Sequence, residues 1–482
     1  MESVASTLKP ARGLWIGGKW IATSDTVTIV NPANGDPVGL SAVGTRAHLD
    51  QAVVAAIEAF RHCRQSPSFE RAELLLRIAR EVERQQVQFA SLIVAESGKP
   101  STLAEAEVQR AIHTFTCAAE EARRFVGEAL SMDAFRSGKG HQGWTRRFPI
   151  GTVYGISPFN FPLNLVAHKL APCLATGNAL ILKPAPKTPL TAWLLAEVLS
   201  NAGVPAGQVN VVTCSNEEAG YLVGDPRIAM TSFTGSPQVG WKLKERAGRQ
   251  KVVLELGGNA AVVVHEDAVL DAAIPSIAYG AFANAGQSCI SVQRVFVHRP
   301  IYAEFRERFL SYVRQEVRMG DPQDRRTLVG PMIDRPAVDR TLDLIRDAAA
   351  AGASVLCGGG ADGQFLPPTV LEKVTDKMSI CTREVFAPVA VLQPYDTFGE
   401  ALDRVNASEF GLQAGVFTSD LNRALLAFEV LEVGGVLVND VPTFRVENMP
   451  YGGVKASGLG REGVRYAMEE MTEIRSMIIR RV

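Results

Sequence analysis

The chain lacks the features that mark several large classes of protein. Its 50 basic and 51 acidic residues give a formal net charge of -1, and no basic run suggests a nucleic acid partner. No apolar stretch reaches the roughly 20 residues that cross a bilayer, so we expect no membrane association. Met1 to Arg12 lacks the charged and apolar regions of a secretory signal.

Cysteine is scarce and has no metal-binding or disulfide pattern. The seven cysteines are scattered without CxxC spacing, which predicts neither a disulfide framework nor a metal site. Reduced thiols are typical of a cytoplasmic protein, so we expect that location. There is also no fixed-period repeat and no low-complexity tract.

What is present indicates a large globular α/β protein. The 482 residues exceed the size of one hydrophobic core, so at least two domains are expected. Near the N-terminus, Trp15 to Trp20 predicts a hairpin and Asn31 to Gly35 a turn. Helical spacing of apolar residues follows, with the helices expected at 49–60, 70–94 and 103–124.

Strands and helices alternate from Gly151 onward. Expected strands are 152–156, 179–182, 209–213, 230–233 and 252–255, and expected helices are 163–176, 190–202 and 239–246. Repeated units of this kind predict a doubly wound parallel sheet covered by helices. A second α/β series begins near Ala261, with helices at 272–282 and 301–317 and strands at 389–392 and 436–439.

The tail from Glu473 to Val482 alternates like a strand but has no local partner in the sequence. Because an unpaired edge is a liability that assembly removes, we expect it to join a neighbouring subunit, beside the stretch Glu128 to Trp144. Gly358 to Gly363 matches G-x-G-x-x-G, but two prolines follow where the dinucleotide fingerprint needs a helix. We interpret it as a surface turn.

Four short segments carry the chemistry. They are 158–162 (PFNFP), 254–259 (LELGGN), 284–289 (NAGQSC) and 384–389 (EVFAPV). A thiolate that adds to an aldehyde creates the tetrahedral carbon from which a hydride can leave, and Cys289 stands in a glycine-containing loop where backbone amides can favour the thiolate. Water must then cleave the resulting thioester, a task suited to a partly desolvated carboxylate.

These segments together resemble the aldehyde dehydrogenase superfamily over essentially the whole chain. The resemblance implies a Rossmann-type cofactor domain at 1–125 and 149–254, a catalytic α/β domain at 255–455 and a small β oligomerisation flap at 126–148 and 468–482. It also implies a homodimer or homotetramer. Cys289 becomes the nucleophile, Glu255 the water-activating base and Asn160 an oxyanion donor with the Cys289 backbone N–H.

The same resemblance implies that the cofactor is NAD or NADP. Its expected ligands are Lys183 at the adenosine ribose, Ser236 between Gly235 and Gly240 at the pyrophosphate, Glu384 at the nicotinamide ribose and Phe386 beside the ring. Pro186 stands where many NAD-preferring members carry a glutamate. Lys187 is either a help to NADP or a surface charge, so the preference stays open.

The substrate is expected to be a small hydroxylated or anionic aldehyde. Arg110 and Arg445 occupy positions where relatives hold a carboxylate, phosphate or sulfonate, although each could equally form a structural ion pair. Phe444 is expected at the mouth of the site. A CoA-acylating dehydrogenase is disfavoured by the presence of Glu255, and a binding protein without turnover by the joint presence of Cys289, Glu255, Asn160 and Glu384.

Overall fold

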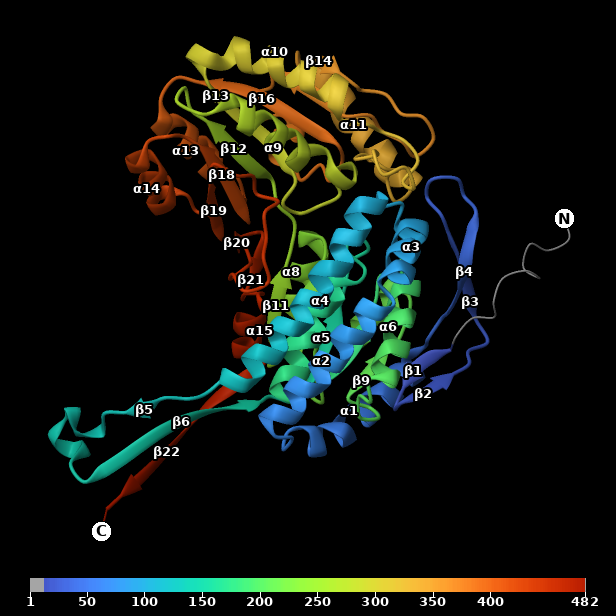
Figure 1. Cartoon of the computed structure of the whole chain (residues 1–482), viewed down its shortest axis with the longest axis vertical. Helices are drawn as coiled ribbons and strands as arrows, with labels where there is room; N and C mark the ends of the chain where they lie inside the picture. The colour runs from blue at the N-terminus through green and yellow to red at the C-terminus, as the bar shows by residue number, and fades with distance from the viewer. Residues whose placement is uncertain (1–12, 482) are drawn as a thin grey trace, which may run out of the picture.

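The computed structural model describes residues 13–481, so the absence of a secretory signal predicted for Met1 to Arg12 lies outside the described residues. Two large sheets occupy the two halves of the molecule, and a long arm projects from one of them (Figure 1). The sequence-based expectation of α/β architecture with parallel sheets is confirmed. No helix among residues 13–481 has the length and apolarity needed to cross a membrane.

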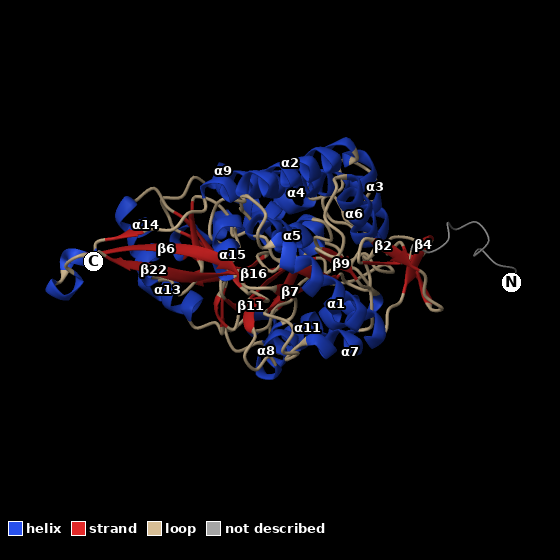
Figure 2. Cartoon of the chain, turned by 90° about the horizontal axis from the view of Figure 1, so that it is seen from below, coloured by secondary structure: helices blue, strands red, loops and turns tan. Residues whose placement is uncertain are grey.

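The first half contains an eight-stranded sheet in the order β2-β1-β9-β8-β7-β10-β11-β21. Figure 2 shows α4, α5 and α6 above these strands and α1, α7 and α8 below them. The central strands are buried along their whole length, as expected for strands covered on both faces. The strands are β1 Leu14–Ile16, β2 Lys19–Ile21, β7 Thr152–Ile156, β8 Ala179–Lys183, β9 Val209–Val211, β10 Met230–Thr234, β11 Lys251–Glu255 and β21 Gly458–Leu459.

The helices of this half agree with the sequence periodicity except at one position. The stretch expected as one helix over 70–94 is two helices, because Gln85 leaves the helical conformation (φ -104°, ψ 16°). A break of one residue with ordinary helix propensity does not disturb apolar periodicity. The helices are α1 Arg46–Cys63, α2 Ser68–Arg84, α3 Gln86–Ser97, α4 Ser101–Arg124, α5 Asn164–Thr176, α6 Leu190–Asn201, α7 Asn216–Ala219, α8 Pro237–Arg246 and α15 Val464–Glu470.

The second half contains a seven-stranded sheet in the order β14-β15-β16-β13-β12-β18-β19. Its strands are β12 Ala260–Val264, β13 Val292–His298, β14 Ser354–Cys357, β15 Thr369–Glu372, β16 Val389–Tyr395, β18 Gln413–Phe417 and β19 Gly435–Val438. Its helices are α9 Leu270–Phe282, α10 Arg299–Glu316, α11 Arg335–Ala350, α12 Ser379–Thr382, α13 Phe398–Asn406 and α14 Leu421–Val430. Short pairs β3 Thr26–Val30 with β4 Pro37–Ala42, and β17 Phe410–Gly411 with β20 Val454–Lys455, complete the described strands outside the arm. No helix follows Gly358 to Gly363, as predicted.

The arm, here called the flap, contains the C-terminal strand. It is a three-stranded sheet of β5 Ala129–Leu130, β6 His141–Pro149 and β22 Thr472–Arg480, and β22 pairs antiparallel with β6 from Thr472–Pro149 to Arg480–His141. The terminal strand therefore lies beside the expected stretch Glu128 to Trp144, but within its own chain, and its joining of a neighbouring subunit stays a prediction. The partner is more than 320 residues away in sequence, so no local pattern could reveal it. The outer edge of β22 has no strand beside it among residues 13–481.

A buried ion pair fixes the start of α5, where the loop bearing Asn160 ends. Lys99 Nζ pairs with Glu107 Oε2, and both side chains are inaccessible to solvent. Glu107 Oε1 accepts from the backbone N–H groups of Leu163 (2.9 Å) and Asn164 (3.2 Å). Burial lowers the pKa of Lys99, and Glu107 opposes that shift. The carboxylate thus replaces a side-chain cap at the helix N-terminus.

Glu107→Gln should destabilise the protein strongly, because it leaves the Lys99 ammonium buried without a counter-charge. We expect a loss of about 3–5 kcal/mol in the free energy of unfolding, read as a lower urea midpoint. Glu105→Gln, on the same helix, removes an exposed pair with Arg325 and is the matched control, with no measurable change expected. Equal midpoints for the two variants would contradict the role given to Glu107.

Candidate active site

Four functional segments leave the eight-stranded sheet at one edge. Strands β7, β8, β10 and β11 run parallel, with Ile156 beside Lys183 and Thr234 beside Glu255. Because parallel strands end at the same edge, the loops that follow them place Asn160, Lys183, Ser236 and Glu255 on one side of the sheet. This is the position where ligands bind in open α/β sheets.

Cys289 follows a strained turn after α9. Asn284 and Ala285 adopt left-handed conformations (φ 55° and 54°), and so does Gly286 (φ 63°). A Cβ at Gly286 would lie 2.2 Å from the carbonyl oxygen of Ala387, so only glycine fits there. Such strain is found where surrounding structure fixes a functional residue. The turn brings Cys289 Sγ to 3.3 Å from the Tyr451 hydroxyl.

Two consecutive glycines let the other segments approach this turn. A Cβ at Gly257 would lie 2.2 Å from Glu384 Oε2, and a Cβ at Gly258 would lie 2.2 Å from the carbonyl oxygen of Cys289. The Gly258 N–H donates to Glu384 Oε1 (3.1 Å). Burial raises the pKa of Glu384 to about 7. The segments containing Glu255, Cys289 and Glu384 therefore meet through backbone that carries no side chain.

Asn160 lies against the same turn. Its Nδ2 donates to the carbonyl oxygen of Gln287 (3.0 Å), two residues before Cys289, while its Oδ1 is buried without a hydrogen-bond partner among the described residues. The amide has two N–H groups, so one remains for a ligand. Beside it, the rings of Phe159 and Phe386 meet edge to face with centroids 6.0 Å apart.

The Glu255 carboxylate is buried, and neither oxygen has a hydrogen-bond partner within residues 13–481. Burial raises its pKa well above the usual range, and the neighbouring Glu462 charge adds to that rise. Gly452 provides the space, since a Cβ there would lie 2.9 Å from Glu255 Oε1. A carboxylate whose pKa is raised is a stronger base than an exposed one, which suits a general base.

The expectation that backbone amides favour a Cys289 thiolate was wrong for the resting protein. Burial raises the pKa of the thiol to about 12, and the Glu384 and Glu255 charges add to this, against the lowering effect of the Tyr451 hydrogen bond. Desolvation is the largest of these effects, and it exceeds the lowering effects of the Tyr451 hydrogen bond and the Arg445 charge. Cys289 is therefore a thiol that needs a proton acceptor when it reacts.

Arg445 is buried in the wall of the site. Its guanidinium carbon lies 3.7 Å from the centroid of the Tyr451 ring, and it pairs with Glu462 (3.2 Å). Its Nη2 donates to His168 Nδ1 (2.9 Å), so the ring proton stays on Nε2, which donates to Glu447 Oε2 (2.6 Å). Arg445 Nε is buried without a partner among the described residues.

Arg110 joins this network from the other side. Its Nε donates to Glu447 Oε1 (2.9 Å), while its Nη2 is buried without a partner in the described chain. His168 and Arg110 lower the pKa of Glu447 well below the usual range, against the opposing effect of burial. Arg110 and Arg445 each form a structural ion pair, which was one of the two alternatives considered for them. Each also has an N–H group without a partner among the described residues. Phe444, next to Arg445, is exposed.

The residues expected at the cofactor lie at the ends of β8 and β10. Lys183 is buried and donates only to Asn216 Oδ1 (2.9 Å) among the described residues, which leaves two ammonium protons for a ligand. Ser236 begins α8 without a side-chain cap on that helix. A Cβ at Gly240 would lie 2.4 Å from Leu256, so this glycine lets α8 pack closely. These free donors fit a ribose and a pyrophosphate.

Pro186 is exposed and carries no charge that could exclude a 2′-phosphate. Lys187 is paired with Asp334 (3.4 Å) and largely exposed, which agrees with the interpretation as a surface charge.

Sequence reasoning missed several residues of the site. It did not single out Tyr451, His168, Glu447 or Glu462. They come from α5 and the chain after β19, and nothing in their local spacing marks them as neighbours of Cys289. The one available signal is the density of charged residues in 445–462, a stretch that is otherwise partly buried.

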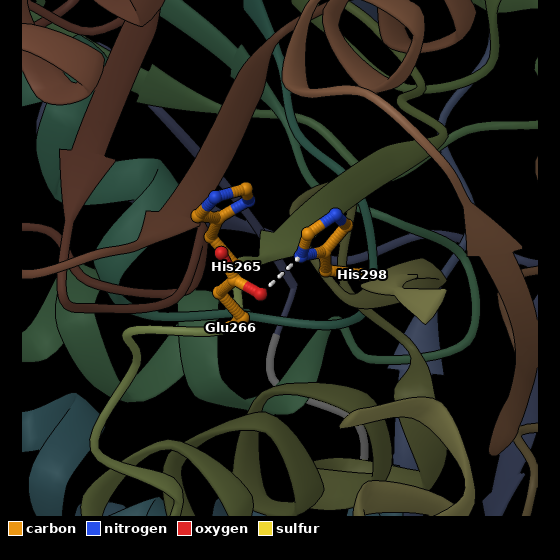
Figure 3. A group of neighbouring side chains, drawn as sticks. All are labelled: His265, Glu266 and His298. Carbon is orange, nitrogen blue, oxygen red and sulfur yellow. Dashed lines mark ion pairs between the residues drawn. The ribbon is translucent and has the colours of Figure 1, made fainter. Parts of the chain in front are cut away.

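A second cluster of potential ligands lies at the ends of β12 and β13, formed by His265, Glu266 and His298 (Figure 3). The two imidazole rings stack with centroids 4.4 Å apart and planes 16° apart. Ring nitrogens bind metals in the ring plane, so stacked rings do not aim at a common point. His265 Nδ1 is also hydrogen-bonded to the Tyr395 hydroxyl (2.8 Å). We assign no metal to this cluster.

Comparison with known proteins identifies the family. The profile of the aldehyde dehydrogenase family matches residues 20–477. The chain belongs to this family. It is 41% identical to the 3-sulfolactaldehyde dehydrogenase of Priestia aryabhattai over 468 residues, which cover 97% of this chain and 98% of that protein.

Solved structures of the family agree with the fold. Aldehyde dehydrogenase 21 from Physcomitrella patens, in complex with the reaction product succinate, matches with a TM-score of 0.96 and 40% identity over 98% of this chain and 99% of its own. The NADP-dependent glyceraldehyde-3-phosphate dehydrogenase from Bacillus halodurans C-125, complexed with NADP, matches with a TM-score of 0.95 and 34% identity over 98% and 100%. The expected enzyme class, an aldehyde dehydrogenase that uses NAD or NADP, is confirmed.

The high pKa of Cys289 predicts how its alkylation depends on pH. Because only the thiolate reacts, the rate of iodoacetamide labelling at Cys289 should rise about tenfold per pH unit from about pH 7 to pH 10, without a plateau. Tyr451→Phe removes the hydrogen bond that lowers the pKa, so labelling should become slower at each pH. Peptide mass spectrometry measures both rates. A plateau below about pH 9 would mean that the resting thiol is not held protonated.

Proposed function

We propose that the chain oxidises a short aldehyde bearing an acidic group to its carboxylate, through a thioester on Cys289 that water activated by Glu255 hydrolyses. The observation that carries the proposal is a half-buried thiol near a buried, unpartnered carboxylate and an amide with a free N–H. Nucleophile, base and oxyanion donor are the three groups that acyl transfer needs.

In the first half-reaction, Cys289 Sγ adds to the carbonyl carbon and gives up its proton to a solvent water molecule. The carbonyl oxygen becomes an oxyanion, which accepts from the Asn160 amide and the Cys289 backbone N–H. Losing one such donor typically costs about 10²–10³ in rate. The bound NAD(P) supplies the acceptor for the hydride. The carbon is then an acyl group in a thioester with Sγ.

In the second half-reaction, Glu255 removes a proton from water as the water oxygen attacks the thioester carbon. The C–S bond breaks, the carboxylic acid leaves and Sγ recovers a proton. The raised pKa of Glu255 makes its carboxylate a stronger base than an exposed one. Glu255 must be ionised to act, so hydrolysis should accelerate as pH rises through that pKa.

The anionic substrate class is supported by the two arginines. Arg110 Nη2 and Arg445 Nε are buried N–H donors without partners in the described chain, and guanidinium groups favour carboxylates, sulfonates and phosphates. The Priestia relative is named for a sulfonated aldehyde, and the Physcomitrella structure holds succinate, a dicarboxylate.

We assign the cofactor to the eight-stranded half, as the resemblance implied for 1–125 and 149–254. Lys183 would hold the adenosine ribose, the N-terminus of α8 at Ser236 the pyrophosphate, and Glu384 the nicotinamide ribose. Residues 255–455 would form the catalytic domain, and residues 126–148 and 468–482 would form the flap. Pro186 leaves either NAD or NADP acceptable.

We also propose that the flap joins copies of this chain into a dimer or tetramer in the cytoplasm. Strand β22 is an open edge with exposed apolar side chains, which association would cover. The cysteines of the described chain are all free, as in a reducing compartment.

Glu255→Gln should separate the half-reactions. A rapid burst of about one equivalent of NAD(P)H per site should survive, while steady turnover and its acceleration with pH should be lost. Stopped-flow absorbance measures both phases. Cys289→Ala is the matched control and should show neither. Equal loss of burst and turnover in Glu255→Gln would instead give Glu255 a role in thiol activation.

Arg110→Gln should impair substrates with an acidic group selectively. We expect KM for a carboxylated aldehyde to rise about 10–100-fold, the equivalent of one charge-assisted hydrogen bond, while KM for a neutral aldehyde of similar length stays the same. The neutral aldehyde serves as the internal control. A parallel rise for both aldehydes would show that Arg110 acts only through Glu447, as part of the wall.

Association through the flap predicts a change in mass. Wild type should elute as a dimer or larger in size-exclusion chromatography with light scattering, and Ile479→Glu should shift it toward the monomer. Val87→Glu, an exposed apolar position on α3, is the control and should not change the mass. A monomeric wild type would contradict the proposal for the flap.

A further inference from the structure

A groove of about 790 Å³ lies at the root of the flap, where β6 and β22 leave the body beside the ends of α2 and α4 (Figure 1). Its volume is in the range of small-molecule sites. None of the residues that line it belongs to the proposed catalytic or cofactor sites.

The charged side chains that line this groove are all positive. Its lining includes six arginines and no aspartate, glutamate or lysine, although the chain as a whole has as many acidic as basic residues. None of the six forms an ion pair with a carboxylate of residues 13–481. They are Arg64, Arg71, Arg123, Arg146, Arg147 and Arg475.

Three glutamates near these arginines in sequence form ion pairs outside the groove. Glu121 pairs with Arg124, Glu469 with Arg465, and Glu473 with Lys251. No ion pair within residues 13–481 neutralises an arginine that lines the groove. Burial, and then the charge of Arg146, lower the pKa of Arg71, as expected for like charges held together.

Several of these guanidinium groups are held in place. Arg71 donates through Nε to the carbonyl oxygen of Ala175 (2.8 Å) and through Nη1 to that of Ser66. Arg146 and Arg475 lie on the Phe148 ring, with guanidinium carbons 5.4 and 4.3 Å from its centroid. Donors fixed before a ligand arrives lose less entropy on binding.

We propose that this groove binds a small polyphosphate anion. Adjacent phosphates present several charged acceptors within one small molecule, which matches several guanidinium groups around one hollow. The face of a second copy of this chain would bring the same six arginines, so symmetric contact through the groove is repulsive. The shared chemistry is the phosphate chain, whether free or attached to a nucleoside.

The test is calorimetric titration of the full-length protein, saturated with cofactor, with inorganic tripolyphosphate. Arg146→Gln combined with Arg475→Gln should weaken binding at least about tenfold, because two charge-assisted contacts are lost. Arg80→Gln combined with Arg249→Gln changes the net charge equally at two exposed positions outside the groove and should leave affinity unchanged. Steady-state aldehyde oxidation without tripolyphosphate should be the same in all three proteins.

Further measurements compare a nucleotide with free polyphosphate and test whether the groove is a subunit contact. ATP should compete with tripolyphosphate whereas adenosine should not, if the phosphates carry recognition; competition by adenosine would overturn the phosphate assignment. Absence of binding at millimolar tripolyphosphate, or equal weakening in both double variants, would overturn the site. The proposal would also be wrong if the wild type did not bind tripolyphosphate and the groove double variant changed the molecular mass of the protein in solution. The groove would then be a contact between subunits.

Discussion

The approach of three chain segments at Gly257 and Gly258 determines the geometry around Cys289. Side chains at these positions would overlap Glu384 Oε2 and the Cys289 carbonyl oxygen, each at 2.2 Å. Strand β11 can therefore end at Glu255 and continue directly between the other two segments. A side chain would not fit at Gly286, in the turn before Cys289, or at Gly452, beside the Glu255 carboxylate. In these motifs the glycines provide space, and the neighbouring residues provide the reactive groups.

The close packing has an electrostatic consequence. Glu255 is buried and Cys289 and Glu384 are half-buried, and burial raises the pKa of all three. The packing therefore makes each of these groups harder to ionise than an exposed one. The charges of Lys169 and Arg445 act in the opposite direction. They lower the pKa of Glu462, whereas burial raises it. Removing either charge would affect the acid–base groups without touching the substrate.

The sequence predicted most helices and strands, because apolar periodicity is local information. The family resemblance implied Asn160, Lys183, Ser236 and Glu255, and the structure places all four at or after strand ends on one edge of the sheet; their roles stay predictions. Partners far apart in sequence were not predictable: the pairing of β22 with β6, and the contacts of His168 and Tyr451 with the site. The raised pKa of Cys289 was missed for the same reason, since the burial that raises it and the Glu384 and Glu255 charges that add to it come from segments far apart in sequence.

The central claim is that the aldehyde carbon becomes an acyl group on Cys289, and the most direct measurement is the mass of that adduct. Glu255→Gln, mixed with aldehyde and oxidised cofactor and quenched in acid, should gain the mass of the aldehyde less two hydrogens. Peptide mapping should locate it on Cys289. An adduct with the full mass of the aldehyde would mean that no oxidation preceded trapping. An adduct on another residue, or none during turnover, would contradict covalent catalysis by Cys289.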